Sequence, residues 1–188
     1  MGFRLFIAGI SLLSLLLPVS CSSIKGVERN AGEALMYGMV YSMENLPVSN
    51  VEVFIDGKST THTDAQGRFI LVSKKRNNFS VSLVKSGYEN VTENFHFEPM
   101  EVIHIVMVNA GQLITQAELS MDEGRYPEVV ALCERALALN HERIDANYLK
   151  ALGLIRMMEY EQARNILKEL QTQIGEREYI QQILEGLR

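Results

Sequence analysis

The sequence has no tryptophan, only two cysteines and no surplus of positive charge. Its 18 Lys and Arg residues stand against 23 Asp and Glu residues, a formal net charge of −5, so we expect no nucleic-acid partner. The absence of tryptophan also counts against a sugar-binding surface. With 47% hydrophobic and 22% charged residues, the composition is that of a globular protein rather than a disordered chain or a polytopic membrane protein.

Long apolar runs are also missing, apart from one near the start. Residues 5–17 are almost wholly apolar, which falls short of the roughly 20 residues that a transmembrane helix needs. A run of this length after Arg4 is typical of a signal peptide, which we assign to residues 1–20. The Pro18-Val19-Ser20-Cys21 ending resembles the lipobox of bacterial lipoproteins, although that family prefers Leu where Pro18 stands.

The lipobox resemblance implies that Cys21 is acylated and becomes the first residue of the mature chain, with membrane lipid as its partner. Ser22 follows in place of Asp, which by analogy with enteric lipoproteins implies sorting to the outer membrane of a bacterial cell envelope. We assign residues 21–35 to the lipidated Cys21 and a polar tether. The alternative is an ordinary secretory signal in which Cys21 is incidental.

Residues 36–109 alternate between short apolar runs and turn residues. This spacing predicts a small all-β sandwich of about seven strands. The expected strands cover residues 37–41, 51–55, 59–63, 68–72, 79–83, 95–97 and 102–108.

Several motifs in this segment resemble the carboxypeptidase regulatory-like domain. They are Gly38-x-Val40, Leu46-Pro47 with Val51-x-Val53, Thr61-x-Thr63-Asp64-x-x-Gly67-x-Phe69 and Lys85-x-Gly87-Tyr88. The resemblance implies a transthyretin-like sandwich that has no catalytic activity of its own and serves as a folding or docking module.

Residues 110–188 change to a helical period, and their pattern recurs after 34 residues. Ala117 matches Ala151, and Tyr126 matches Tyr160. A 34-residue period resembles the tetratricopeptide repeat, which implies an all-α helical repeat of about five helices. We assign repeats to residues 110–143 and 144–177 and a cap helix to 178–187, so the fold class is a mixed two-domain protein. Because about three repeats are usually needed for stability, we expect the helical array to be stabilised by packing against the sandwich or against another protein.

The concave face of the tetratricopeptide family is lined by the first helix of each repeat, which implies a partner groove here. The corresponding positions are Ile114, Glu118, Met121, Tyr148 and Arg156. Their apolar members would hold an apolar peptide or helix of another envelope protein. The alternative, equally open, is that they pack against the sandwich.

No catalytic or metal-binding motif stands out in the sequence. His96 and His104 do not face each other across the expected strands, which disfavours a metal site shared by His62, His96 and His104. Cys133 lies on an apolar helical stripe that predicts a buried thiol. We therefore expect no enzyme, no cofactor and no metal. The sequence favours a lipid-anchored, non-enzymatic interaction scaffold or assembly factor, with a glycan- or cell-wall-binding lipoprotein as the alternative.

Overall fold

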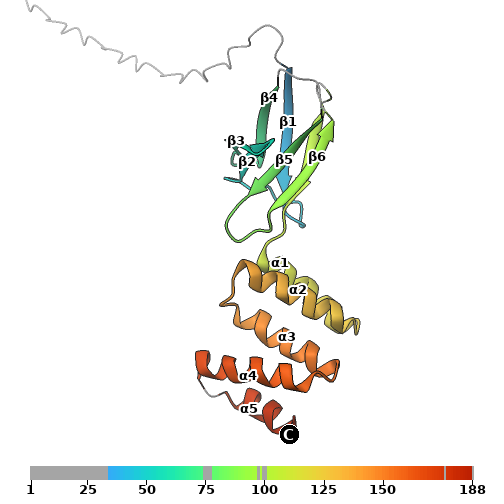
Figure 1. Ribbon diagram of the computed structural model, residues 1–188, viewed down its shortest axis with the longest axis vertical. Coiled ribbons are helices and arrows are strands. Elements are labelled where there is room, and N and C mark those ends of the chain that lie inside the picture. The colour runs from blue at the N-terminus through green and yellow to red at the C-terminus, as the bar shows by residue number, and fades with distance from the viewer. Residues whose placement is uncertain (1–33, 74–77, 97, 99–100, 176, 188) are drawn as a thin grey trace, which may run out of the picture. The chain divides into compact units, whose positions relative to one another are not determined.

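The computed structural model describes residues 34–73, 78–96, 98, 101–175 and 177–187, in which strands come first and helices follow (Figure 1). The strands are β1 (Ala34–Tyr41), β2 (Glu52–Ile55), β3 (Lys58–His62), β4 (Arg68–Ser73), β5 (Asn78–Val84), β6 (Val91–His96) and β7 (Val102–Val106). The helices are α1 (Ala110–Asp122), α2 (Tyr126–Leu139), α3 (Ile144–Arg156), α4 (Tyr160–Ile174) and α5 (Glu178–Gly186). The expected order of a β part followed by an α part is confirmed.

The described strands form two sheets that share one hydrophobic core. The first sheet has the order β4-β1-β7, with β1 antiparallel to β4 and parallel to β7. The second has the order β3-β2-β5-β6 and is antiparallel throughout. Alternate side chains of both sheets meet in the core, because successive residues of a strand point to opposite faces. Its buried residues include Met36, Val40, Val53, Leu71, Val81, Leu83, Ile103 and Ile105.

At two glycines of the motifs, the fold leaves no room for a side chain. Gly38 lies opposite Phe69 in the β1–β4 ladder, and a Cβ at position 38 would overlap the Phe69 ring. Gly67 has φ +73°, and a Cβ there would overlap the carbonyl oxygen of Val40. The neighbouring Thr63 is buried, where its hydroxyl donates to the Val48 carbonyl and accepts from the Val51 N–H. These residues therefore build the fold rather than a reactive site.

The helices repeat with the period expected from the sequence. Helices α1 and α3 each have 13 residues and begin at positions 110 and 144, which are 34 apart. Helices α2 and α4 begin at 126 and 160, also 34 apart, and α5 begins 34 positions after α3. Consecutive helices pack on each other from α1 to α5. Fully buried alanines at positions 117, 136, 151 and 163 let these helices approach closely.

Three strand boundaries differ clearly from those expected. Strand β6 begins at Val91 rather than at 95, because Val91 pairs with Leu83 of β5. Strand β1 already begins at Ala34, because Leu35 pairs with Val72 of β4, so the last two residues assigned to the tether are strand. Strand β7 ends at Val106 rather than 108, because Asn109 caps α1 and its side chain accepts from the N–H of Gln112. The signal peptide, Cys21 and the tether up to residue 33 lie outside the described residues.

Candidate interaction surfaces

The five residues expected to line a partner groove do not form one surface. Ile114 is only 5% exposed and packs in the core that α1 shares with α2 and α3, so it contributes to the helical core instead. Met121 is half-buried at the margin of the same core. Glu118 and Arg156 are exposed on α1 and α3.

Tyr148 packs against the last helix, an arrangement that differs from both sequence-based alternatives. Its ring lies edge-on to that of Tyr179 in α5, with centroids 5.5 Å apart and an interplanar angle of 89°. Burial raises the pKa of the Tyr148 hydroxyl above its usual range. Helix α5 therefore occupies the position where a partner was expected to meet Tyr148.

Exposed apolar side chains lie next to one another on the outer face of the β4-β1-β7 sheet, which we call the outer β face. It consists of the side chains that alternate with the core residues of these strands. They are Leu35, Tyr37, Met39 and Tyr41 of β1, Arg68, Ile70 and Val72 of β4, and Val102, His104 and Val106 of β7. Its apolar members are exposed to a degree that core residues never are: Val106 is 50% exposed, Ile70 46% and Val72 44%.

Cross-strand rows give the outer β face its chemistry. Tyr37 pairs with Ile70 on one side and Val102 on the other, which makes a row without charge. The next row pairs Met39 with Arg68 and His104. His104 is stacked on Tyr41 with ring centroids 6.0 Å apart and an interplanar angle of 7°. None of the ten positions is a carboxylate, so the face is apolar with two basic side chains in its middle.

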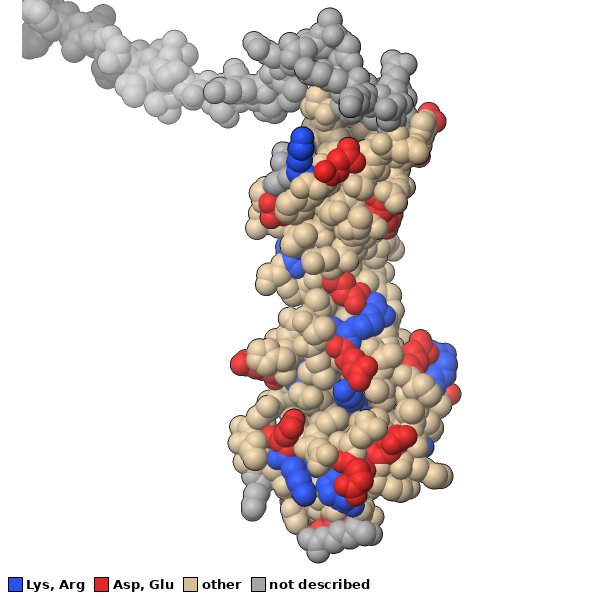
Figure 2. Space-filling view, viewed as in Figure 1, with Lys and Arg blue, Asp and Glu red and all other residues tan. Residues whose placement is uncertain are grey.

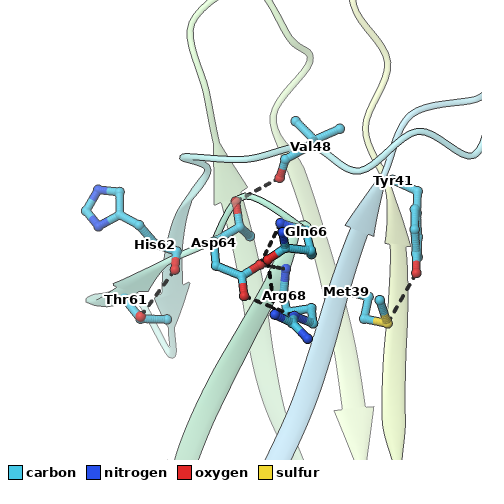
Figure 3. Close-up of polar contacts among 9 residues, drawn as sticks. Met39, Tyr41, Val48, Thr61, His62, Asp64, Gln66 and Arg68 are labelled. Carbon is cyan, nitrogen blue, oxygen red and sulfur yellow. Dashed lines mark hydrogen bonds and ion pairs between the residues drawn. The ribbon is translucent and has the colours of Figure 1, made fainter. Parts of the chain in front are cut away.

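Arg68 is already paired within the chain. Its Nε lies 3.0 Å from the Asp64 carboxylate, and its guanidinium also donates to the Gln66 side chain at 3.0 Å (Figure 3). The backbone N–H of Arg68 donates to Asp64, and this bond holds the pKa of that carboxyl below its usual range. Arg68 therefore brings little uncompensated charge to the outer β face.

Sequence reasoning missed this face, although a signal was present. A sheet with one wet face alternates apolar and polar residues, whereas a strand covered on both faces is apolar throughout. In β7 both alternating sets are apolar apart from His104, and in β1 the outward set is Leu35, Tyr37, Met39 and Tyr41. This pattern indicates a strand with two apolar faces, of which only one is buried in the chain.

Ion pairs and hydrogen bonds also connect the strands to the helices. Glu89, between β5 and β6, accepts two hydrogen bonds from the Arg135 guanidinium of α2 at 2.8 and 2.7 Å. The Arg135 hydrogen bonds hold the pKa of Glu89 below its usual range. Gln112 of α1 donates to the Glu44 carboxylate. These contacts use polar groups that the sequence analysis did not single out.

Two cavities are polar and open. One of about 360 Å³ is lined by Asn50, Glu52, His62, Val84, Lys85 and Ser86, and one of about 260 Å³ by Arg164, Lys168, Gln171, Gln181 and Leu184. Lys85 is engaged in the chain itself, since its ammonium donates to the Ser49 carbonyl and lies 5.5 Å from the centre of the Tyr88 ring. Neither cavity contains any of the five expected groove residues.

The described residues offer little for metal or covalent chemistry. Within the ranges given above, no group of three or more His, Cys, Asp and Glu side chains is arranged to hold a metal ion. Burial raises the pKa of the Cys133 thiol to about 12, far from that of a nucleophilic cysteine. The same residues contain no helix long and apolar enough to cross a bilayer. On the face seen in Figure 2, acidic and basic side chains are mixed over the helices, without a patch of one sign.

Comparisons with known proteins do not assign a family. No protein-family model and no curated protein matches the sequence. Among solved structures, the chain is similar in part to 3-chlorocatechol 1,2-dioxygenase from Rhodococcus opacus, at 12% identity and a TM-score of 0.34 over 44% of this chain and 62% of the other. The Bacillus anthracis TIE protein is 14% identical, with a TM-score of 0.35 over 42% of this chain and 17% of the other. The major pilin subunit of Bacillus cereus is 12% identical, with a TM-score of 0.33 over 41% of this chain and 28% of the other. The chain thus spans less than two thirds of each of these proteins, and similarity this low identifies neither family nor function.

Proposed function

We propose that this protein is a lipid-anchored, non-enzymatic interaction protein of the bacterial cell envelope, acting as a scaffold or assembly factor. The observation that carries the proposal is the outer β face. Large contiguous apolar patches on the surface of a protein commonly mark interaction sites. Eight of the ten side chains of this face, on three adjacent strands, are apolar or aromatic, and Val106, Ile70 and Val72 are each more than two fifths exposed.

The proposal includes two domains. Residues 36–109 would form a transthyretin-like sandwich of the carboxypeptidase regulatory-like kind, which the shared core of the two sheets and the roles of Gly38 and Gly67 support. Residues 110–188 would form tetratricopeptide-like repeats, which the 34-residue spacing of the helices supports. In this arrangement α5 is the cap helix, because its Ile180 is fully buried against α3 and α4.

The anchor can be tested through Cys21. Cells that produce the full chain would be labelled with a palmitate analogue and fractionated, with Cys21→Ala as the variant. We expect the label and the membrane association to be present in the unchanged chain and lost in the variant. Cys133→Ala is the matched control and should keep both. Labelling that persists in Cys21→Ala would refute acylation at this residue.

The interaction surface can be tested by placing a charge in the apolar row of the outer β face. Tyr37→Glu and Ile70→Glu, each 38% or more exposed in the folded chain, would be combined and compared with the unchanged chain by crosslinking in cells and mass spectrometry. A defined envelope protein should be captured by the unchanged chain and lost in the double variant. The double variant Glu118→Lys, Arg156→Glu, on the exposed side of α1 and α3, is the control. Unchanged capture in the Tyr37, Ile70 variant would move the interaction away from the sheet.

One observation favours the alternative of a glycan- or cell-wall-binding lipoprotein. Tyr37 and Tyr41 share the outer β face, four residues apart on β1, and sugars stack on such rings. Binding of the full chain to purified cell-wall sacculi, compared with Tyr37→Ala, separates the two functions. If the unchanged chain sediments with sacculi and Tyr37→Ala does not, the result supports the glycan-binding function. If the unchanged chain does not sediment with sacculi, the result supports the protein scaffold.

A further inference from the structure

We propose that β7 is a self-pairing edge, through which the β7 strands of two copies of this chain pair antiparallel and join their β4-β1-β7 sheets into one sheet of six strands. Among the strands that the structure describes, β7 stands at the end of its sheet, with β1 as its one neighbour. An edge strand presents a row of free N–H and C=O groups, and natural proteins usually protect such a row with charges, proline or a bulge. Strand β7 reads Val102-Ile103-His104-Ile105-Val106 and has no Lys, Glu, Asp or Pro.

The hydrogen bonds of β7 show which backbone groups face outward. The Met107 N–H donates to the Tyr41 carbonyl of β1 at 2.9 Å, so Met107 points to β1. Because the direction alternates along a strand, Ile103 and Ile105 also point to β1. Val102, His104 and Val106 therefore direct their backbone N–H and C=O groups to the outer edge. Among the described residues, none donates to or accepts from these outer groups.

The free edge is bounded at one end. Val108 directs its backbone groups to the same outer side as Val106, and its carbonyl accepts from the Glu89 N–H at 2.8 Å. The neighbouring Asn109 forms a bridge with Tyr88. The segment around Glu89 thus closes the edge beyond Val106, and the open stretch is β7 itself.

The sequence of β7 identifies a second copy as the occupant. A two-fold interface requires a surface that is complementary to itself. The five residues read the same in both directions, so an antiparallel partner centred on His104 opposes Val102 to Val106, Ile103 to Ile105 and His104 to itself. In this register the three outward-facing residues of one copy exchange six backbone hydrogen bonds with those of the other. A partner strand shifted by one residue would place outward N–H groups opposite residues that face the other way.

The size of the contact sets its strength. Stable complexes bury roughly 800 Å² on each partner, and one five-residue edge provides much less. We therefore expect a reversible dimer, which is best trapped covalently. The trap must also report register, because another protein's strand could occupy the same edge.

Single cysteines on β7 make that trap. The full chain would carry His104→Cys, Val102→Cys or Val106→Cys and be oxidised in intact cells, with dimer scored on non-reducing gels. Residue 104 faces its own copy at about 5.5 Å between Cα atoms, which a disulfide can span. The two copies of residue 102 would be about 14 Å apart, too far for a disulfide. Residue 102 of one copy instead lies opposite residue 106 of the other. We expect dimer from His104→Cys and from a mixture of the Val102→Cys and Val106→Cys chains, and none from Val102→Cys alone.

The controls separate pairing from random collision. Ile70→Cys is similarly exposed on the same outer β face, but on the opposite edge strand, and should give no dimer above the unchanged chain. Adding His104→Pro to the mixed pair removes one outward N–H from each copy without touching the β1–β7 bonds, and should lower dimer at least about fivefold.

Three results would overturn the proposal. One is dimer from Ile70→Cys as strong as from His104→Cys. Another is dimer from Val102→Cys alone, which contradicts the register. The third is His104→Cys trapped only on a different protein, or not trapped at all, while circular dichroism and thermal melting match the unchanged chain.

Discussion

At the residue scale, Met158 has a left-handed backbone conformation that is unfavourable for its side chain, at a position where the preceding repeat has glycine. Met158 has φ +66° in the turn between α3 and α4, and Gly124 has φ +75° at the position 34 residues earlier. Equivalent backbone hydrogen bonds close both turns. The Gly124 N–H donates to the Met121 carbonyl, and the Met158 N–H donates to the Ile155 carbonyl. The turn geometry thus demands a left-handed residue, and the sequence supplies glycine only once.

We expect Met158→Gly to raise the free energy of unfolding by about 0.5 kcal/mol, because relief of left-handed strain exceeds the added freedom of the unfolded chain. The Met158 side chain is 75% exposed, so little packing is lost. Gly124→Ala should lower stability by about 1 kcal/mol. Urea unfolding of both variants is the measurement, and a destabilised Met158→Gly would show that its side chain has a packing role.

Cys133 is expected to be inert in the folded protein. Its thiol is fully buried and its pKa is raised to about 12, so almost none is thiolate at pH 8. Iodoacetamide should therefore modify Cys133 only after denaturant is added, as followed by intact-protein mass spectrometry. Equal rates with and without denaturant would mean that the α1–α3 core opens readily.

At the element scale, the Glu89–Arg135 pair gives stability a defined pH dependence. The folded-state pKa of Glu89 is depressed by Arg135, so the pair stabilises above the unfolded pKa of a Glu, and the effect disappears as pH falls through the folded value. Because half of the Arg135 side chain is exposed, the contribution is less than about 1 kcal/mol.

We expect Glu89→Gln to be slightly less stable than the unchanged chain at pH 7, and this deficit to shrink as pH is lowered from 7 towards 3. Thermal melting across this range is the measurement. Glu118→Gln, an exposed carboxyl on α1, is the control and should show no such convergence. A Glu89→Gln deficit that stays constant down to pH 3 would assign the effect to packing rather than charge.

Helix α5 depends on few side chains. It has nine residues, and Ile180 is its buried member in a core with Leu167 and Leu170 of α4. Ile180→Ala should cost about 2–4 kcal/mol locally and raise amide hydrogen exchange in α5 more than in α1 or α2. Tyr179→Ala, at the exposed neighbouring position, should do so less. Uniform exchange throughout the helices would mean that α5 unfolds only with the whole array.

The elements themselves were largely predictable. Alternation in β5, the apolar run of β7 and the 34-residue match of Tyr126 with Tyr160 can be read from the sequence alone. They led to strands and helices close to those observed, except that β6 begins four residues earlier than expected. The pairing of β1 with β7 was not predictable, because nothing local to 34–41 or 102–106 states which strands are neighbours. For the same reason the exposed outer β face was missed. The burial of Ile114 was not predictable either, because its position in the repeat indicates a helix face but not how deeply that side chain packs in the helical core.

At the scale of the whole molecule, the outer β face should dominate solubility. Val72→Lys combined with Val106→Lys replaces two exposed apolar side chains on edge strands, so the core should keep its packing. We expect melting temperature to change little and the concentration at onset of aggregation to rise, as measured by light scattering. Glu118→Gln with Asp122→Asn, which makes the same +2 change in net charge on α1, is the control. An equal gain from the control would assign the effect to net charge alone.

The parallel pairing of β1 with β7 has a consequence for how the chain folds. Tyr37 lies beside Val102, so 64 residues separate the first strand from one of its two neighbours in the sheet. Closing so long a loop is entropically costly and slows folding, whereas the helices contact mainly their sequence neighbours and fold quickly. During folding, β1 therefore has only β4 as a partner in this sheet until β7 joins it. The helical array completes itself soon afterwards, and closure of the first sheet becomes the slow step.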